Sequence, residues 1–260
     1  MPTPIQHLVI AKRILSAPEL PACVRARLDT DDAVRGAFFF GHIAPDVQVV
    51  SRQSRESTHF FTLPPTSPQP AFQTMFETHP QLARPDALPA TQAAFILGYI
   101  SHLMLDQAWA GEIFYPIFGP KQAWDGWRER LLLHNVLRAW LDRRDLPAMP
   151  ADVDDLLGHA RPHGWLPPER ATDADLCRWR DLVADQFAPG AAIRTVEIFA
   201  NRARVPDAEF LALLEPEVMA MRIFSHISVG ELDAFYERAI ARTFDLTLSY
   251  LNGCALGESV

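Results

Sequence analysis

The stretch Gly98–Trp109, GYISHLMLDQAW, decides how the rest of this 260-residue chain has to be arranged. It is compatible with a helix and places His102 and Asp106 four residues apart, where two side chains share one helix face. An imidazole nitrogen and a carboxylate oxygen on that face can bind the same metal ion. Because the neighbouring residues are apolar, the helix is expected to be buried. A buried carboxylate is costly unless it is paired or metal-bound.

Candidate partners for this pair lie upstream in the chain. Asp46 ends the turn-forming string Gly41–Asp46, in which Pro45 biases the preceding residue away from helix. His59 lies just before a proline-rich segment, and His7 lies in an N-terminal segment with helical periodicity. Each of the three offers an imidazole or a carboxylate to a buried site.

Together, His7, Asp46, His59, His102 and Asp106 form a mixed imidazole and carboxylate set. Such a set suits zinc, and iron or manganese also accept these ligands. Four of the residues can close one site, and the fifth suggests a second ion that shares a carboxylate. Two ions roughly 3.5–4 Å apart can activate water and hold a phosphoryl oxygen.

The order of these motifs resembles a known family. His7, the turn ending at Asp46, His59 followed by Phe60, and Gly98–Trp109 occur in the order seen in the bacterial zinc-dependent phospholipase C family. The fungal single-strand nucleases are its relatives. The resemblance extends from His7 to about Trp109. It implies an all-α fold, a compact multi-helix bundle of the phospholipase C and nuclease type, here with additional C-terminal helices.

The resemblance also implies ligand roles and an activity. Asp46, His59, His102 and Asp106 would bind one zinc ion, and His7 would bind a second zinc ion bridged by Asp106. The implied activity is hydrolysis of a phosphate ester.

The sequence departs from the family pattern at several positions. The family carries a later H-x-x-x-E pair, but here Arg138 stands four residues after His134, and Asp142 lies a further turn on. His42 stands where many relatives have a small or acidic residue. The chain opens with Met1, whereas the secreted enzymes use a processed terminal amino group as a ligand. We therefore expect one or two metal ions and not three.

The leading hypothesis is a metal-dependent hydrolase, in which water activated by the metal attacks phosphorus and Asp46 acts as the base. One alternative is a metal-dependent tailoring or biosynthetic enzyme on the same fold. An enzyme with a redox-active iron pair is the form of this alternative that differs most from a hydrolase. Another is a non-catalytic, degenerate member of the fold that acts as an interaction module.

Each candidate residue also has a purely structural interpretation. His102 and Asp106 can form a buried hydrogen bond that orients a helix, and Asp46 can be a helix N-cap. His7 can be an ordinary helix-face histidine. The sequence leaves open whether His42 or His134 joins the site.

Composition restricts the classes of molecule that the protein can bind and the cellular compartment in which we expect it. The net charge is −8, from 24 basic and 32 acidic residues, which argues against a broad nucleic-acid surface. We expect a small phosphorylated or phospholipid-like substrate. The three cysteines, Cys23, Cys177 and Cys254, fit reduced thiols. No secretory signal and no run of roughly 20 apolar residues is visible, so we expect a cytoplasmic protein.

Helical periodicity dominates the chain, and prolines separate the helices. Asp46–Ser51 is the only short candidate for a strand. We expect a metal-binding region, residues 1–146, with a C-terminal helical region, residues 147–260, packed on it; the alternative is one single domain. The ten helices predicted are His7–Ser16, Ala22–Phe40, Ala71–Glu77, Ala90–Trp109, Gln122–Arg143, Ala151–Ala160, Asp173–Phe187, Ala191–Ala200, Asp207–Phe224 and Gly230–Leu251.

Overall fold

The protein is all-helical. The computed structural model describes residues 1–122 and 124–251, and no strand is present in these ranges, which confirms the predicted fold class. Cys254 lies outside the described residues. The α-helices are α1 (Pro4–Ser16), α2 (Ala22–Leu28), α3 (Asp32–Gly41), α4 (Arg55–His59), α5 (Ala71–Thr78), α6 (Ala90–Trp109), α7 (Tyr115–Phe118), α8 (Trp127–Asp145), α9 (Val153–His159), α10 (Asp173–Ala184), α11 (Thr195–Ala203), α12 (Asp207–Ala212), α13 (Pro216–Arg222) and α14 (Val229–Leu251).

The predicted strand at Asp46–Ser51 is wrong. The segment Ala44–Val49 forms a 3₁₀ turn, η1, with Pro45 in its first turn. Proline fixes φ near the helical value and has no N–H group to donate to a strand ladder, so it favours the start of a helical turn here. Asp46 consequently lies on a tight turn directly after α3.

Two predicted helices are each divided in the structure. The prediction Ala22–Phe40 corresponds to α2 and α3, because Asp31 accepts a hydrogen bond from the Val34 N–H and starts a new helix. The prediction Asp207–Phe224 corresponds to α12 and α13, where Pro216 stands at the first position of the second helix. The short helix α4, which carries His59, has no counterpart among the predicted helices.

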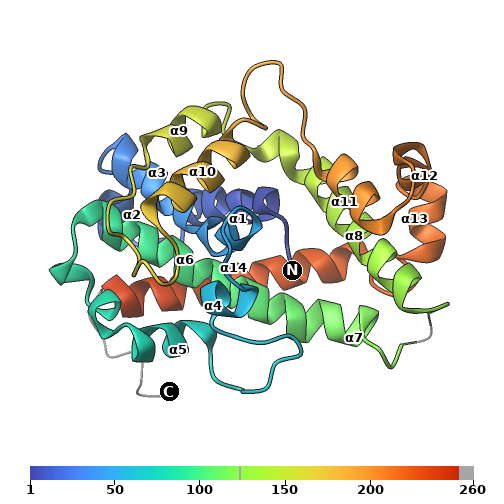
Figure 1. Ribbon diagram of the computed structural model, residues 1–260, viewed down its shortest axis with the longest axis horizontal. Coiled ribbons are helices and arrows are strands. Elements are labelled where there is room, and N and C mark those ends of the chain that lie inside the picture. Colours follow the sequence, from blue (N-terminus) through green and yellow to red (C-terminus); the bar gives the residue numbers. More distant parts are fainter. Residues whose placement is uncertain (123, 252–260) are drawn as a thin grey trace.

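Helix α6 runs through the middle of the molecule, with α14 and α3 beside it (Figure 1). Its contact with α3 is unusually close, because two glycines face each other there. A Cβ atom added to Gly98 would lie 2.3 Å from the Phe38 carbonyl oxygen, and one added to Gly41 would lie 2.1 Å from the Phe95 carbonyl oxygen. The absence of side chains at these two positions lets the two backbones meet.

We predict that Gly98→Ala lowers the free energy of unfolding by about 2 kcal/mol, because the added methyl group forces α3 and α6 apart. Gly158→Ala is the matched control, since nothing lies within 4 Å of a Cβ at that helical position. Urea unfolding of both variants measures the effect. Equal midpoints for the two variants would contradict the close contact.

The buried carboxylate of Asp142 joins three helices. It accepts hydrogen bonds from the Thr3 hydroxyl, from the Gln6 amide at 3.4 Å and from the Thr195 hydroxyl at 2.7 Å. Burial raises the pKa of Asp142 to about 6, against these hydrogen bonds, which lower it. Asp142 therefore links the start of α1, the end of α8 and the start of α11.

The raised pKa predicts a pH-dependent stability. Between the usual pKa of 3.8 and about 6, the folded protein holds a proton on Asp142 that the unfolded chain has lost. This carboxyl therefore costs stability as the pH rises through that window. The stability advantage of the wild type over Asp142→Asn should fall by roughly 2 kcal/mol between pH 4 and pH 7. Urea unfolding across this range tests it, and a constant difference would contradict it.

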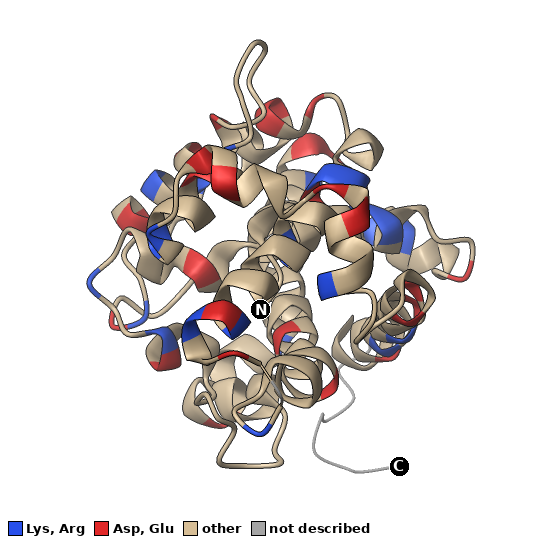
Figure 2. Cartoon of the chain, turned by 90° about the vertical axis from the view of Figure 1, so that its right-hand side faces the viewer, with Lys and Arg blue, Asp and Glu red and all other residues tan. Residues whose placement is uncertain are grey.

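The helices after residue 147 pack against those before it. Helix α9 packs on α3, α10 packs on η1, and α14 packs on α1 and α6. The division of the chain at this point stays a prediction. On the side of the molecule shown in Figure 2, acidic and basic residues are interspersed. Among the described residues, no helix combines the length and apolarity that crossing a membrane requires.

Candidate metal centre

Helix α6 places His102 and Asp106 on one face, with His102 Nε2 at 3.7 Å from Asp106 Oδ2 and both side chains fully buried. The Nδ1 atom of His102 lies 2.7 Å from the carbonyl oxygen of His42. A carbonyl can only accept, so Nδ1 carries the proton and Nε2 presents a lone pair to the cluster. The backbone of His42 reaches this ring because α3 ends against α6 at the two facing glycines.

His59, the last residue of α4, also points its Nε2 into the cluster. Its Nδ1 lies 3.1 Å from the Thr58 hydroxyl and 3.2 Å from the carbonyl oxygen of Arg55. That Nε2 lies 3.4 Å from Asp106 Oδ2 and 3.5 Å from Asp46 Oδ1. The hydroxyl of Tyr99, on α6, donates to the Thr58 carbonyl and so fixes the end of α4 against α6.

Asp46 comes from the turn η1 and is 21% exposed. The Trp179 Nε1–H of α10 donates to the Ile43 carbonyl at 2.7 Å and so holds the start of this turn. Burial acts to raise the pKa of Asp46, but the hydrogen bond from His59 and the charge of His102 outweigh it. They hold the pKa well below its usual value, so Asp46 is ionised near neutral pH.

Four of these atoms are joined by contacts of the length found between metal ligands, and His59 Nε2 contacts the other three. The Nε2 atoms of His59 and His102 lie 3.3 Å apart, and the carboxylate contacts just described range from 3.4 to 3.7 Å. Ligands at the usual zinc distance of roughly 2.0–2.1 Å in a tetrahedron are separated by about 3.4 Å. Asp46, His59 and His102 form one group able to hold an ion. His7, His102 and Asp106 form another.

His7 lies on the other side of Asp106. Its Nε2 is 3.4 Å from Asp106 Oδ1, and its ring stacks on the His102 ring with the centroids 3.7 Å apart. Neither His7 nitrogen has a hydrogen-bond partner. Burial, together with the charge of His102, lowers the pKa of His7 to about 4. His7 is therefore a neutral, unpartnered imidazole at a buried carboxylate, which is the state in which histidine binds metals.

The Nε2 atoms of His59 and His102 face each other at 3.3 Å, so a proton or a metal ion has to lie between them. His102 Nδ1 lies against the His42 carbonyl, whereas His59 Nδ1 lies 3.1 Å from the Thr58 hydroxyl and 3.2 Å from the Arg55 carbonyl. His59 can therefore carry its proton on either nitrogen, and an Nε2–H of His59 or a protonated His102 satisfies the contact without a metal. Burial acts to lower the pKa of His102, but the Asp106 carboxylate raises it. A metal ion is the other arrangement, and an ion held by His7, His102 and Asp106 also gives the unpaired Nε2 of His7 a partner.

Arg55 belongs to this cluster, although the sequence reasoning missed it. Its Nη2 donates to Asp106 Oδ2 at 2.7 Å, while its Nη1 is buried without a partner. The available signal was its position four residues before His59, which places both on one face of a helical turn. That signal was hidden because α4 spans only five residues and lacks a recognisable periodic pattern.

The two histidines whose roles the sequence left open lie outside the group of four. The ring of His42 is buried edge-on against Phe38, with the centroids 4.8 Å apart, and only its backbone carbonyl meets His102. His134 accepts a hydrogen bond from the Trp109 Nε1–H at 3.0 Å and packs on Phe118. This bond occupies the Nε2 lone pair of His134 within an aromatic cluster.

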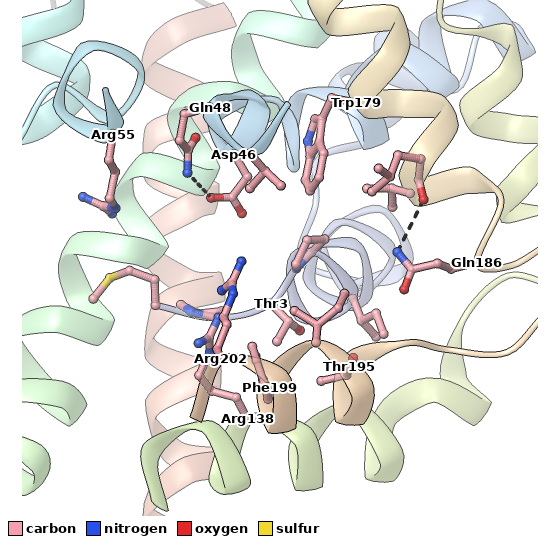
Figure 3. Close-up of a pocket in the computed structure, with 18 residues that line it drawn as sticks. Thr3, Asp46, Gln48, Arg55, Arg138, Trp179, Gln186, Thr195, Phe199 and Arg202 are labelled. Atoms are coloured by element: carbon pink, nitrogen blue, oxygen red, sulfur yellow. Dashed lines mark hydrogen bonds between the residues drawn. The ribbon is translucent and has the colours of Figure 1, made fainter. Parts of the chain in front are cut away.

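A cavity of about 310 Å³ adjoins the cluster (Figure 3). Asp46 and Arg55 line it, which connects the buried ligands to a space that a substrate can enter. Arg138 and Arg202 lie on the opposite side, and Trp179 and Phe199 contribute apolar surface.

Comparisons with protein-family models, with curated proteins and with solved structures find no match for this chain. The resemblance to the zinc-dependent phospholipase C family therefore stays a prediction. The geometry of the cluster supports metal binding independently of that resemblance.

We predict that Tyr99→Phe weakens zinc binding by ~10-fold, because the Thr58 carbonyl then no longer fixes His59. Tyr250→Phe is the control, since the Tyr250 hydroxyl also donates to a buried carbonyl, that of Leu82, away from the cluster. Both variants should lose about 1 kcal/mol of stability. Competition with a chromophoric chelator measures the affinity. Equal zinc affinity in the two variants would show that the Tyr99 bond does not position the site.

Proposed function

We propose that this protein is a metal-dependent hydrolase of a phosphate ester, with zinc as the metal. The observation that carries the proposal is the convergence of donor atoms from Asp46, His59, His102 and Asp106, joined by contacts of 3.3–3.7 Å. The unpartnered His7, on the other oxygen of Asp106, supports a second ion. The adjoining cavity gives a substrate access to this cluster.

The reaction needs no electron donor or acceptor. The oxygen of water bonds to phosphorus, the P–O bond to the alcohol breaks, and a proton from the water ends on the departing alcohol oxygen. A divalent ion bound here supplies a Lewis acid for the phosphoryl oxygens and lowers the pKa of water.

The protein groups around the cluster have distinct roles in this proposal. Of the two cluster carboxylates, Asp46 lines the cavity, so it can receive a proton from water as well as ligate. Its low pKa makes it a weak base, so ligation is its main role. Arg55 neutralises part of the charge of Asp106 and lines the cavity, where its positive charge favours an anionic substrate.

Elemental analysis of the protein purified without a histidine tag should find one or two zinc ions per chain, and His102→Ala should lose them. His159→Ala is the matched control, because His159 and Asp155 form an exposed pair with the same spacing on α9, 3.9 Å apart. Its zinc content should equal that of the wild type.

Hydrolysis of p-nitrophenyl phosphate should follow the metal content across these variants. Iron in place of zinc, seen as a coloured protein, would favour the tailoring or biosynthetic alternative. A wild type that contains no metal after reconstitution would show that a proton joins His59 and His102. The proposal of a metal-dependent enzyme would then be rejected.

A further inference from the structure

Two chemically different kinds of surface line the cavity beside the cluster. Apolar surface comes chiefly from Trp179 and Val183 of α10 and from Ile198 and Phe199 of α11. Three arginines also line the cavity: Arg138 of α8 and Arg202 of α11 lie together, and Arg55 of α4 lies across from them. A ligand that matches the cavity therefore needs an anionic group and an apolar group close together.

Arg138 faces this cavity without a carboxylate partner. Its Nη1 donates to the Asn135 side-chain oxygen at 3.1 Å, its Nε is buried with no partner, and its guanidinium stacks on Phe199 at 4.5 Å. Among the described residues, it forms no ion pair within 4.0 Å, although Asp142 lies one turn further along α8. Burial lowers the pKa of Arg138 to about 10, and the charge of Arg202 contributes to the shift.

Arg202 lies beside Arg138 on the same side of the cavity, opposite Asp46 (Figure 3). In the part of the chain that the structure describes, Arg202 also forms no ion pair within 4.0 Å. The two like charges repel each other, the Asp142 and Asp46 carboxylates offset part of this cost, and a bound anion offsets more of it. Guanidinium groups bind phosphate oxygens through paired hydrogen bonds.

The size and charge of the cavity restrict the anion. At about 310 Å³, the cavity is at the small end of the range for ligand pockets, and the two acyl chains of a phospholipid do not fit in it. A phosphate monoester carries a charge of about −1.5 to −2 near neutral pH, whereas a diester carries one negative charge. Two unpaired guanidinium groups match the monoester better.

We propose that Arg138 and Arg202 bind the phosphoryl dianion of a small phosphate monoester, whose apolar alcohol group packs on Phe199 and Trp179. This assignment rests on the hydrolase function proposed above and specifies its substrate class. In this position the phosphoryl group lies between the two arginines and Asp46, the residue that connects the cavity to the metal cluster.

Binding of phenylphosphonate, measured by calorimetry, tests the site without turnover, because its ring is bonded directly to phosphorus. The wild type should bind it more tightly than methylphosphonate, which lacks the ring, and more tightly than its monomethyl ester, which has one negative charge. Arg138→Gln and Arg202→Gln should each weaken binding by ~10- to 100-fold. Arg194→Gln is the control, because Arg194 is exposed and pairs with Glu197 at 2.8 Å.

Zinc content should stay at the wild-type value in all three variants, which separates this site from the metal cluster. Arg202 is exposed, so its variant keeps the test decisive even where Arg138→Gln fails to fold. Unchanged phenylphosphonate affinity in Arg202→Gln, or equal affinity for the monoanionic ester, would overturn the proposal. Arginine-dependent binding without any hydrolysis would leave this site standing and remove the hydrolase function.

Discussion

The buried carboxylate of Asp106 is the constraint on which the rest of the structure depends. It is 1% exposed in the middle of the central helix, where an unpaired charge would be strongly destabilising. Three elements meet this demand: α1 supplies His7, α4 supplies Arg55 and His59, and α6 itself supplies His102. Burial and these neighbours act in opposite directions on the pKa of Asp106, and the neighbours keep it well below its usual value. The arrangement of the N-terminal elements around α6 is therefore also the arrangement of the candidate site.

The close contact of α3 with α6 also orients His102, one of the candidate metal ligands. Because Gly41 and Gly98 carry no side chains, the end of α3 comes near enough for the His42 carbonyl to accept the Nδ1 proton of His102. That hydrogen bond sets the tautomer of His102 and directs Nε2 towards Asp106, as is usual for metal-binding histidines. The turn η1 follows α3 directly in the chain, so the same contact also brings this turn, and with it Asp46, towards α6. Helix packing and ligand orientation are thus two results of the same pair of glycines.

The charges around the cluster and the cavity bear on the ligand that can bind there. Asp46, Asp106 and Asp142 provide three negative charges near the positive charges of Arg55, Arg138 and Arg202. A divalent ion at the cluster would give this region a positive excess. A dianionic ligand is the natural complement, and it is the kind of ligand on which the proposed metal centre acts. The metal site and the arginine pair therefore support the same chemistry from separate observations.

Local periodicity and spacing were sufficient to predict the helical fold class, the limits of α6 and the placement of His102 and Asp106 on one face. They also indicated His7, Asp46 and His59 as donors; in the structure His7 meets Asp106, His59 meets His102, and Asp46 meets His59. Arg55 was not predicted, because its helix is too short to show a pattern. The roles of Arg138 and Arg202 were likewise invisible, since nothing in α8 or α11 shows that both helices face one cavity. The positions of these arginines depend on how helices distant in sequence pack together. Local sequence patterns do not relate such residues, so the tertiary structure was needed to place them.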